Sequence, residues 1–470
     1  MKYKLPFFYD YVFPNMVLPN ALITEFGLVN YLHTLHSNRQ NFNSFFEEQL
    51  GDQNPVTALF DTSLGTWPNS LRTNGTHMSA GCYWESLEYY EDSLFYGKKK
   101  TNKYIYPIKI SPHIDDFIGY NLRHGSKLNG EYFWKHMSAE ALADVHSGRA
   151  IVFLDYAQEN YVDKHSYCNL HEVIKLSGIP KSQIILAFNS FNARELYESW
   201  FSPDERMLEV HNWPFVMTNS SFHYGYIEKS YLNILEFTLS QHSHRDNYFL
   251  FKIKRPRNHR LALLYKMCTD GLLEKGDWSC ITSPEFNEHQ VNAIAAAYNF
   301  QIDVAKVQEL YKKFPYPLKN ERDIDLSTVS AWSDKNSDAH KNSYFYICTE
   351  TFTNSEYKSL TEKVFKPIIN FQPFLFVAYP GALKLLKELG FKTFDGFIDE
   401  SYDDEPDESK RIHMIYAEIT RLCAMSKEEI HNWFWSMKDI LFHNNKHLLQ
   451  VWKNEPIGAE LIKYLHNRLV

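Results

Sequence analysis

The stretch "YFYICTETFTNSEYKSLTEKVFKPI", residues 344–368, decides the fold of the second half of this chain. Its first six residues, 344–349, form a nearly continuous apolar run that predicts a strand buried on both faces. After a polar loop, Thr361 is a suitable N-cap and Glu362 complements the positive end of the helix that should follow. Pro367 then falls in the second turn and removes a hydrogen bond, so the helix either begins later or bends there. A buried strand followed by a helix is typical of a parallel α/β layer.

Glu362 and Lys363, side by side at the start of this helix, have two interpretations. In the simpler one, Glu362 only complements the helix dipole and Lys363 is a solvated surface charge. In the other, Lys363 and the free N–H groups of the helix start bind a phosphate, and the adjacent carboxylate accepts hydrogen bonds from two vicinal hydroxyls, such as those of a ribose. Taken alone, these residues favour the simpler interpretation.

The same alternation of strand and helix extends in both directions along the chain. We expect a first α/β unit that begins with the apolar run 150–154, and a second that begins with the strand 247–253. The further strands expected are 182–190 and 373–381, and the helices expected are 169–178, 192–201, 258–273, 287–299, 303–314 and 381–391. From about Lys427 onward the pattern predicts helices only. The fold class is therefore α/β, with two Rossmann-like domains and a helical carboxyl end.

We place the domain boundaries at 1–240 and 241–440, with a helical tail at 441–470 that could return to the first domain. Residues 1–145 show no strong periodicity, and the acidic run 399–409 is expected to be a solvated loop. Ligands of open parallel sheets bind beyond the carboxyl ends of the strands. The loops that follow the strands should therefore line a cleft.

Composition excludes several classes of function. The chain has 470 residues, 44% of them hydrophobic, and a formal net charge of −8, which argues against a general nucleic-acid binder. Its six cysteines are far apart in the sequence, so neither zinc spacing nor a disulfide framework is expected. No apolar run approaches the ~20 residues of a membrane span, and we expect a reduced, cytoplasmic protein. The glycine-rich phosphate loops of dinucleotide oxidoreductases and P-loop NTPases are missing from the sequence.

A basic segment follows the first strand of the second unit. The stretch "FKIKRPRNHRLALL", residues 251–264, contains Arg257 and Arg260 next to a predicted helix start. By itself it could be a solvated basic loop. Together with Lys363, however, these arginines could hold a diphosphate through fixed positive charge, without a metal.

Residues 344–381 resemble the donor-binding segment of the α-1,3-fucosyltransferases and their relatives, in which a strand leads to an E-N-S loop and a Y-x-T-E-K helix start. The form T-E-K-x-F-K-P-I is similar to that of predicted glycosyltransferases of bacteriophages and bacteria, and the resemblance spans residues 247–411. It implies a GT-B glycosyltransferase with two facing Rossmann-like domains, a nucleotide-diphosphate sugar, GDP- or UDP-linked, as donor, and no essential metal or other cofactor.

The resemblance also implies roles for particular residues. Glu362 would bind the ribose hydroxyls, Lys363 the phosphates, and either Arg257 or Arg260 the β-phosphate. The remaining donor-site candidates match the motif positions around them: Asn354, Ser355, Tyr357 and Thr361. Two departures affect the base and sugar end of the site. Thr353 stands where the family has the glutamate of E-N-S, and Tyr357 lies four residues before Thr361 instead of two.

An inverting transfer needs a base for the acceptor hydroxyl, and the first domain should supply it. Glu159 is the first candidate because it follows the clearest strand of that domain, and Asp155 is close to it in sequence. Asp115 and Asp116 come second and His113 third. All of these could instead be helix caps or surface carboxylates.

The acceptor is left open by the sequence, as are the sugar and the oligomeric state. A glycan or similar hydroxyl compound is one possibility. A hydroxymethylated base in DNA is another, with the basic stretch 96–104 as a weak candidate for a DNA groove and base flipping as a requirement. A third interpretation is a glycosyltransferase-like module without activity, but the charged set of Arg257, Arg260, Glu362 and Lys363 argues against it.

Overall fold

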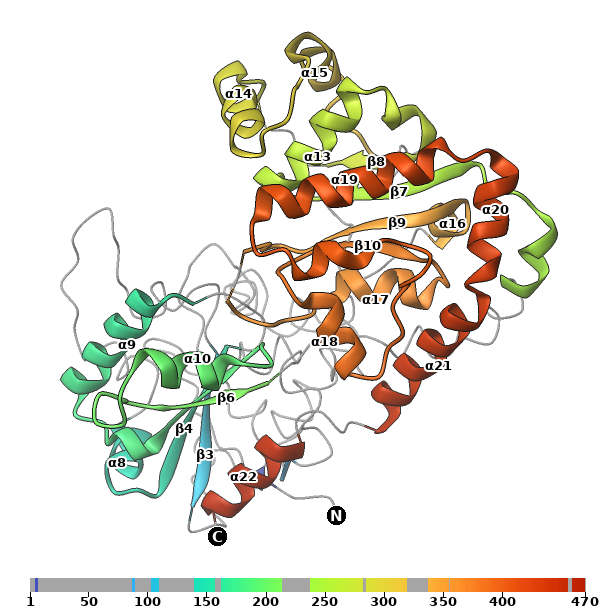
Figure 1. The fold of residues 1–470 in the computed structure, drawn as a ribbon. Helices are drawn as coiled ribbons and strands as arrows, with labels where there is room; N and C mark the ends of the chain where they lie inside the picture. The colour runs from blue at the N-terminus through green and yellow to red at the C-terminus, as the bar shows by residue number, and fades with distance from the viewer. Residues whose placement is uncertain are drawn as a thin grey trace, which may run out of the picture. The chain divides into compact units, whose positions relative to one another are not determined.

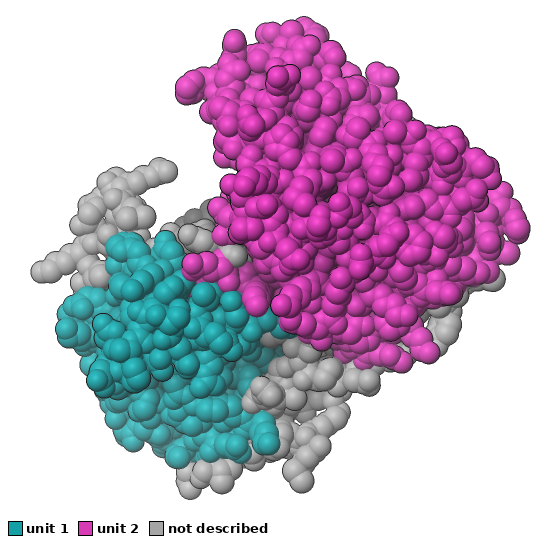
Figure 2. All heavy atoms as spheres, viewed as in Figure 1, with its two compact units in different colours: residues 1–221, 455–470 teal, residues 222–454 magenta. Residues whose placement is uncertain are grey.

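The contacts of the chain divide it into two compact units in a computed structural model. Unit 1 consists of residues 1–221 and 455–470, and unit 2 of residues 222–454 (Figure 2). The structure describes residues 5–6, 87–88, 103–109, 139–156, 162–213, 237–281, 285–318, 337–354, 356–454 and 459–469.

Unit 1 is built on a four-stranded parallel sheet with the strand order β3-β4-β5-β6. Its strands are β3 (Tyr104–Lys109), β4 (Ala150–Tyr156), β5 (Ile184–Phe188) and β6 (Glu209–Asn212). A separate pair of two-residue strands, β1 (Leu5–Pro6) and β2 (Leu87–Glu88), is also parallel. Because parallel neighbours need a crossover connection, helices alternate with the strands: α8 (Ala139–His146), α9 (Lys164–Ser177) and α10 (Ala193–Trp200).

Helix α9 has a capping residue at each end. The Asp163 carboxylate caps its start by accepting a 2.7 Å hydrogen bond from the Ser166 amide. Gly178 ends it in the left-handed region, at φ 69°, where glycine has no steric penalty. Val173 and Ile174 lie fully buried on the inner side, and β5 beyond them is buried along its whole length.

The last helix, α22 (Ala459–Leu469), belongs to unit 1 although it follows unit 2 in sequence. The Tyr464 hydroxyl donates to the Glu209 carboxylate on the edge strand β6. Arg468 Nη1 lies 2.5 Å from Glu209 Oε1, and Arg468 Nη2 donates to the Ser182 carbonyl. Two polar contacts therefore fix α22 to the strand β6, and a third fixes it to the segment before β5, all of them more than 250 residues earlier in the chain.

Unit 2 has a second four-stranded parallel sheet, in which the strand order reverses. Its order is β10-β9-β7-β8, with β7 (Asn247–Ile253), β8 (Asp277–Cys280), β9 (Ser343–Thr349) and β10 (Phe374–Val377). The chain moves from β7 outward to β8 and then returns to the other side of β7 for β9. The point between β7 and β9 is thus a topological switch point, where doubly wound sheets bind their ligands.

Helices cover both faces of this sheet, because right-handed crossovers that run in opposite directions put their helices on opposite sides. On one side, α13 (Asn258–Thr269) contacts α19 (Glu408–Ala424), and on the other, α17 (Glu362–Ile369) contacts α21 (Lys438–Asn454) (Figure 1). The other helices of the unit are α14 (Glu288–Ala297), α15 (Val304–Tyr311), α16 (Ser337–Lys341), α18 (Ala382–Glu388) and α20 (Lys427–Ser436).

The predicted fold class, α/β with two Rossmann-like sheets and a helical carboxyl end, is confirmed. Helix α17 begins at Glu362, as the capping pattern indicated, and continues through Pro367. Arg257 is the N-cap residue of α13 but makes no side-chain capping bond.

The acidic run 399–409 is an ordered part of the fold and was wrongly predicted to be a solvated loop. Asp399 caps the short 3₁₀ helix η9 (Glu400–Asp404), and Asp407 caps α19. Asp403 is 8% exposed and accepts hydrogen bonds from the Leu383 and Lys384 amides at the start of α18. Carboxylates in this run are therefore used as helix caps.

Candidate donor-binding site in unit 2

The candidate site is the switch point of unit 2, where the loops after β7 and β9 begin. Leu250 pairs with Tyr346 in the sheet, so Lys254 and Glu350 emerge at the same edge. The loop after β9 runs to Thr361, where α17 starts, and the loop after β7 runs to Arg257, where α13 starts. Two helix N-termini are thus delivered to one edge of the sheet.

Glu350 anchors the start of α17, a role that the sequence did not predict. Its carboxylate is only 4% exposed and accepts the Thr361 hydroxyl at 2.9 and 2.7 Å and the Thr361 amide at 3.2 Å. Thr361 is also the N-cap of α17, because its hydroxyl accepts from the Lys363 amide. The buried carboxylate therefore fixes the helix start to the end of β9.

Lys363 carries its ammonium group into the same cluster. Its Nζ donates to the Thr361 hydroxyl at 2.8 Å and lies 3.2 Å from Glu362 Oε1 and 3.6 Å from Glu350 Oε2. Burial would lower the pKa of Lys363, but the two carboxylates outweigh it and raise that pKa. The side chain is 23% exposed, and its charged ammonium group is held at the switch point by these contacts.

The Glu362 carboxylate remains ionised because cationic side chains lie close to it. Burial would raise its pKa, but Lys363 and Lys366 outweigh this and lower it. Its side chain is 16% exposed. Glu362 thus offers carboxylate oxygens, the acceptors that a pair of vicinal hydroxyls requires.

The Arg260 guanidinium donates hydrogen bonds to backbone carbonyls near the ends of β7 and β9. Arg260 is 5% exposed, and its guanidinium donates to the carbonyls of Thr349 and Glu350 at 3.1 and 2.8 Å and of Arg255 at 3.0 Å. His259 adds a second bond to the Glu350 carbonyl, at 3.0 Å. Burial, and then the positive charge of Arg260, lower the pKa of His259 to about 3, so this imidazole is neutral and can donate only through Nε2–H.

Arg257 is held differently. It is exposed, and as the N-cap of α13 it makes no side-chain capping bond. Its Cζ lies 5.7 Å from the centre of the Phe352 ring, which belongs to the loop after β9. A cation–π contact of this kind orients the guanidinium and leaves its N–H donors available.

The other predicted residues are placed as follows. Asn354 is exposed, Tyr357 is 2% exposed in the core, and Ser355 lies outside the described residues. Asp155 lies in β4, opposite Lys109 and Ala187, but its side chain is not among those described. The remaining base candidates, Glu159, Asp115, Asp116 and His113, also lie outside the described residues, as does nearly all of the basic stretch 96–104.

Thr353, which the motif comparison put in the place of the E-N-S glutamate, has a structural contact. Its hydroxyl donates to Glu408, and its carbonyl accepts from Arg411. Arg411 is 1% exposed and also donates to the Ala378 carbonyl at 3.1 Å, so it ties the loop after β9 to the loop after β10. Glu350, directly after β9, is the buried glutamate of this loop, and it was not among the predicted site residues. Its place next to the strand end was the signal that could have identified it.

Two features are absent from the described part of the chain. No group of three or more His, Cys, Asp or Glu side chains among the described residues is arranged to hold a metal ion. Nor does any described helix combine the length and apolar character that crossing a membrane requires.

Comparison with known proteins gives a distant structural likeness. No protein-family model and no curated protein sequence matches the chain. Among solved structures, the chain is similar to an α,α-trehalose-phosphate synthase (UDP-forming) from Burkholderia vietnamiensis, with 9% sequence identity and a TM-score of 0.40. The match covers 92% of this chain and 85% of that one. A likeness this distant does not identify a substrate.

Proposed function

We propose that this protein is a nucleotide-sugar-dependent glycosyltransferase of the GT-B kind that binds its donor at the switch point of unit 2. The observation that carries the proposal is the pair of cations there. Lys363 follows β9, Arg257 follows β7, and both stand at helix starts beyond the carboxyl ends of adjacent parallel strands. Helix N-termini with fixed cations suit a diphosphate.

In this proposal Lys363 and Arg257 bind the diphosphate. Arg257 is preferred to Arg260 because the Arg260 guanidinium already donates to three backbone carbonyls, whereas Arg257 is exposed. As the bond to the sugar breaks, negative charge develops on the leaving diphosphate. Cations that are already in place stabilise that charge without reorganisation.

Glu362 receives the ribose in this arrangement. Its ionised carboxylate can accept a hydrogen bond from each of two vicinal hydroxyls, and Lys363 next to it holds the phosphate end. Asn354, which is exposed in the loop after β9, and Ser355 beside it would lie toward the base or sugar. The resemblance of residues 344–381 to the α-1,3-fucosyltransferase donor segment supports the same assignment.

The acceptor proton would be taken by a carboxylate of unit 1. Glu159 is our first choice, since it follows β4, and Asp155, Asp115 and Asp116 are the alternatives. Such a base takes the proton as the acceptor oxygen attacks the sugar from the face opposite the diphosphate, which inverts the configuration.

A thermal-shift screen of UDP- and GDP-sugars tests the proposal most directly. A ligand present at 100 times its Kd stabilises the protein by about 2.7 kcal/mol. We expect one nucleotide class to stabilise the wild type and to stabilise Lys363→Ala clearly less at the same concentration. Sugar release or transfer from the same donor would then demonstrate the activity, whereas stabilisation without either would point to a binding module. Salt-dependent retention on DNA would identify a DNA acceptor.

A further inference from the structure

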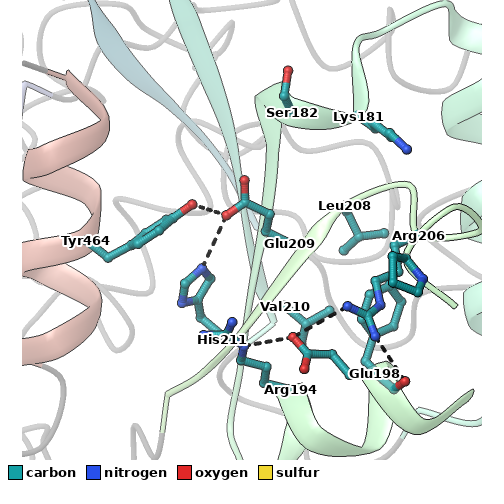
Figure 3. Close-up of a pocket in the computed structure, with 12 residues that line it drawn as sticks. Lys181, Ser182, Arg194, Glu198, Arg206, Leu208, Glu209, Val210, His211 and Tyr464 are labelled. Carbon is teal, nitrogen blue, oxygen red and sulfur yellow. Dashed lines mark hydrogen bonds and ion pairs between the residues drawn. The ribbon is translucent and has the colours of Figure 1, made fainter. Parts of the chain in front are cut away.

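Unit 1 contains a hollow along the edge strand β6 that the proposed function does not use. Its volume is about 400 Å³, which lies in the range of small-molecule sites. Leu208 and Val210, each 4% exposed, provide apolar surface (Figure 3). The walls come from the 3₁₀ helix η5 (Lys181–Gln183), from α10 and the segment after it, and from α22. We call it the β6 hollow.

One side of the β6 hollow is cationic. It is lined by Lys181, Arg194 and Arg206. The Glu198 carboxylate on the same side forms ion pairs with both arginines. Arg206 is locked by the backbone, because its Nε and Nη2 donate to the carbonyls of Phe201 and Glu198 at 3.0 and 3.1 Å. A guanidinium held in this way is oriented before any ligand arrives.

Cationic donors on this side remain available. Arg194 contacts Glu198 through Nε at 2.9 Å, and neither of its Nη atoms hydrogen-bonds to a described residue. Lys181 is exposed and forms no ion pair within the described part of the chain. Figure 3 draws Lys181 and Arg206 on the side opposite Tyr464.

The carboxylate on the other side does not cancel this charge. Glu209 is bound by the Tyr464 hydroxyl and by Arg468, and His211 Nε2 lies 3.8 Å from it. Burial would raise the pKa of Glu209, but His211 and Arg468 outweigh it and lower that pKa. Three cationic side chains and two carboxylates line the hollow. Outside the lining, Arg468 pairs with Glu209 and Glu195 acts on Arg194, so a net positive charge remains there, in a chain whose net charge is −8.

We propose that the β6 hollow binds a small organic phosphate, with the phosphate toward Lys181, Arg194 and Arg206 and the organic part over Leu208 and Val210. A hollow of this size exceeds what an inorganic ion fills, and the apolar surface favours a ligand with a carbon body. Glu209 and His211 would face its hydroxyl groups. A planar guanidinium that is already oriented matches the geometry of a phosphate, and the second negative charge of a phosphate dianion strengthens the attraction relative to a carboxylate.

The test is calorimetric titration of the full chain with sn-glycerol 3-phosphate, and with glycerol, inorganic phosphate and lactate as separate probes. All titrations use the Lys363→Ala background, so that phosphate binding at the proposed donor site does not contribute. We expect saturable binding of glycerol 3-phosphate to one site, weaker binding of inorganic phosphate and of lactate, and none of glycerol.

The double variant Lys181→Gln/Arg194→Gln should weaken the binding of glycerol 3-phosphate at least tenfold. Both side chains are exposed, so the fold should survive. Lys103→Gln/Lys175→Gln removes the same charge from exposed positions of unit 1 outside the hollow and should leave binding unchanged. Equal losses in the two double variants, or no saturable binding, would overturn the proposal. Lactate binding as tight as glycerol 3-phosphate binding would replace the phosphate class with a carboxylate class. None of these outcomes depends on glycosyl transfer.

Discussion

The Glu350 carboxylate accepts hydrogen bonds from both the hydroxyl and the amide of Thr361, eleven residues later in the chain. A hydroxyl has a single proton, and this one is directed at Glu350. Its lone pairs are therefore left to accept from the Lys363 amide and ammonium groups, at 3.5 and 2.8 Å. One buried carboxylate thus sets the position of the helix start and of the lysine on it.

Removing the hydroxyl of Thr361 should affect both the fold and the site. Thr361→Val loses the N-cap and leaves the Glu350 carboxylate without its closest partner, and we expect a loss of about 1–3 kcal/mol in the free energy of unfolding. Thr361→Ser keeps the hydroxyl and should retain most of the stability. Urea denaturation of the two variants measures the difference. Equal stabilities would show that the hydroxyl contributes nothing to the helix start.

Lys363→Ala should abolish most donor binding while the protein stays folded. A hydrogen bond to a charged group contributes about 1.5–3 kcal/mol, which corresponds to a ten- to hundredfold weaker affinity for the nucleoside diphosphate. Lys410→Ala is the matched control, because Lys410 is exposed in the first turn of α19 in the same unit. Titration calorimetry with UDP and GDP provides the measurement. Unchanged affinity in Lys363→Ala would remove the lysine from the phosphate site.

Mutation of the two arginines at the switch point should have two different effects, one on nucleotide affinity and one on stability. Arg257→Ala should weaken nucleotide binding about tenfold or more with little change in Tm, because the side chain is exposed. Arg260→Ala should instead lower the free energy of unfolding by about 2–4 kcal/mol, since the carbonyls of Arg255 and Thr349 lose their side-chain donor and that of Glu350 keeps only His259. Measuring Tm and nucleotide affinity for both variants distinguishes the roles. A stable Arg260→Ala protein with impaired binding would exchange the two assignments.

His259 should make unit 2 less stable as the pH falls. Its pKa is about 3 in the folded state and near 6.5 in the unfolded state, so below pH 6.5 the unfolded chain binds a proton that the folded one does not. Between pH 7 and 5 this costs about 2 kcal/mol. In His259→Gln the amide can still donate to the Glu350 carbonyl, but it does not titrate in this pH range. The urea-unfolding free energy of this variant should therefore depend less on pH, by that amount, than that of the wild type. Parallel pH profiles for the two proteins would contradict the assignment.

Glu159→Gln tests the proposed base. We expect kcat to fall by about a hundredfold or more, because the carboxylate that takes the acceptor proton is lost, while the affinity for the donor stays the same. Asp155→Asn is measured alongside it. If kcat falls only in the Asp155 variant, the base is Asp155, and if it falls in neither, Asp115 and Asp116 follow.

The central strands could be predicted from the sequence, and most of the edge strands could not. β4, β5, β7 and β9 lie inside their sheets and are rich in buried apolar residues. In the two four-stranded sheets, the strands that were missed, β3, β6 and β8, are all at sheet edges. An edge strand needs fewer apolar residues and tolerates a proline, as Pro107 in β3 shows, because one side of its backbone makes no ladder bonds.

The residues of the candidate site also differ in how far the sequence could predict their roles. Thr361, Glu362 and Lys363 are neighbours in sequence, so the helix start could be predicted from local pattern alone. The functions of Glu350 and Arg260 depend on contacts across 11 and about 90 residues. Sequence spacing gives no information about which of two arginines points at backbone carbonyls.

The return of α22 to unit 1 affects how the protein is made. Unit 1 consists of two segments, and residues 222–454 separate them. During synthesis the ribosome must complete all of unit 2 before Tyr464 and Arg468 exist to bind Glu209. Until then the Glu209 carboxylate on the edge strand β6 lacks both of these partners, and incomplete domains are prone to aggregation during folding. Unit 2 is continuous in sequence and needs no later segment, so we expect the second half of the polypeptide to mature before the first.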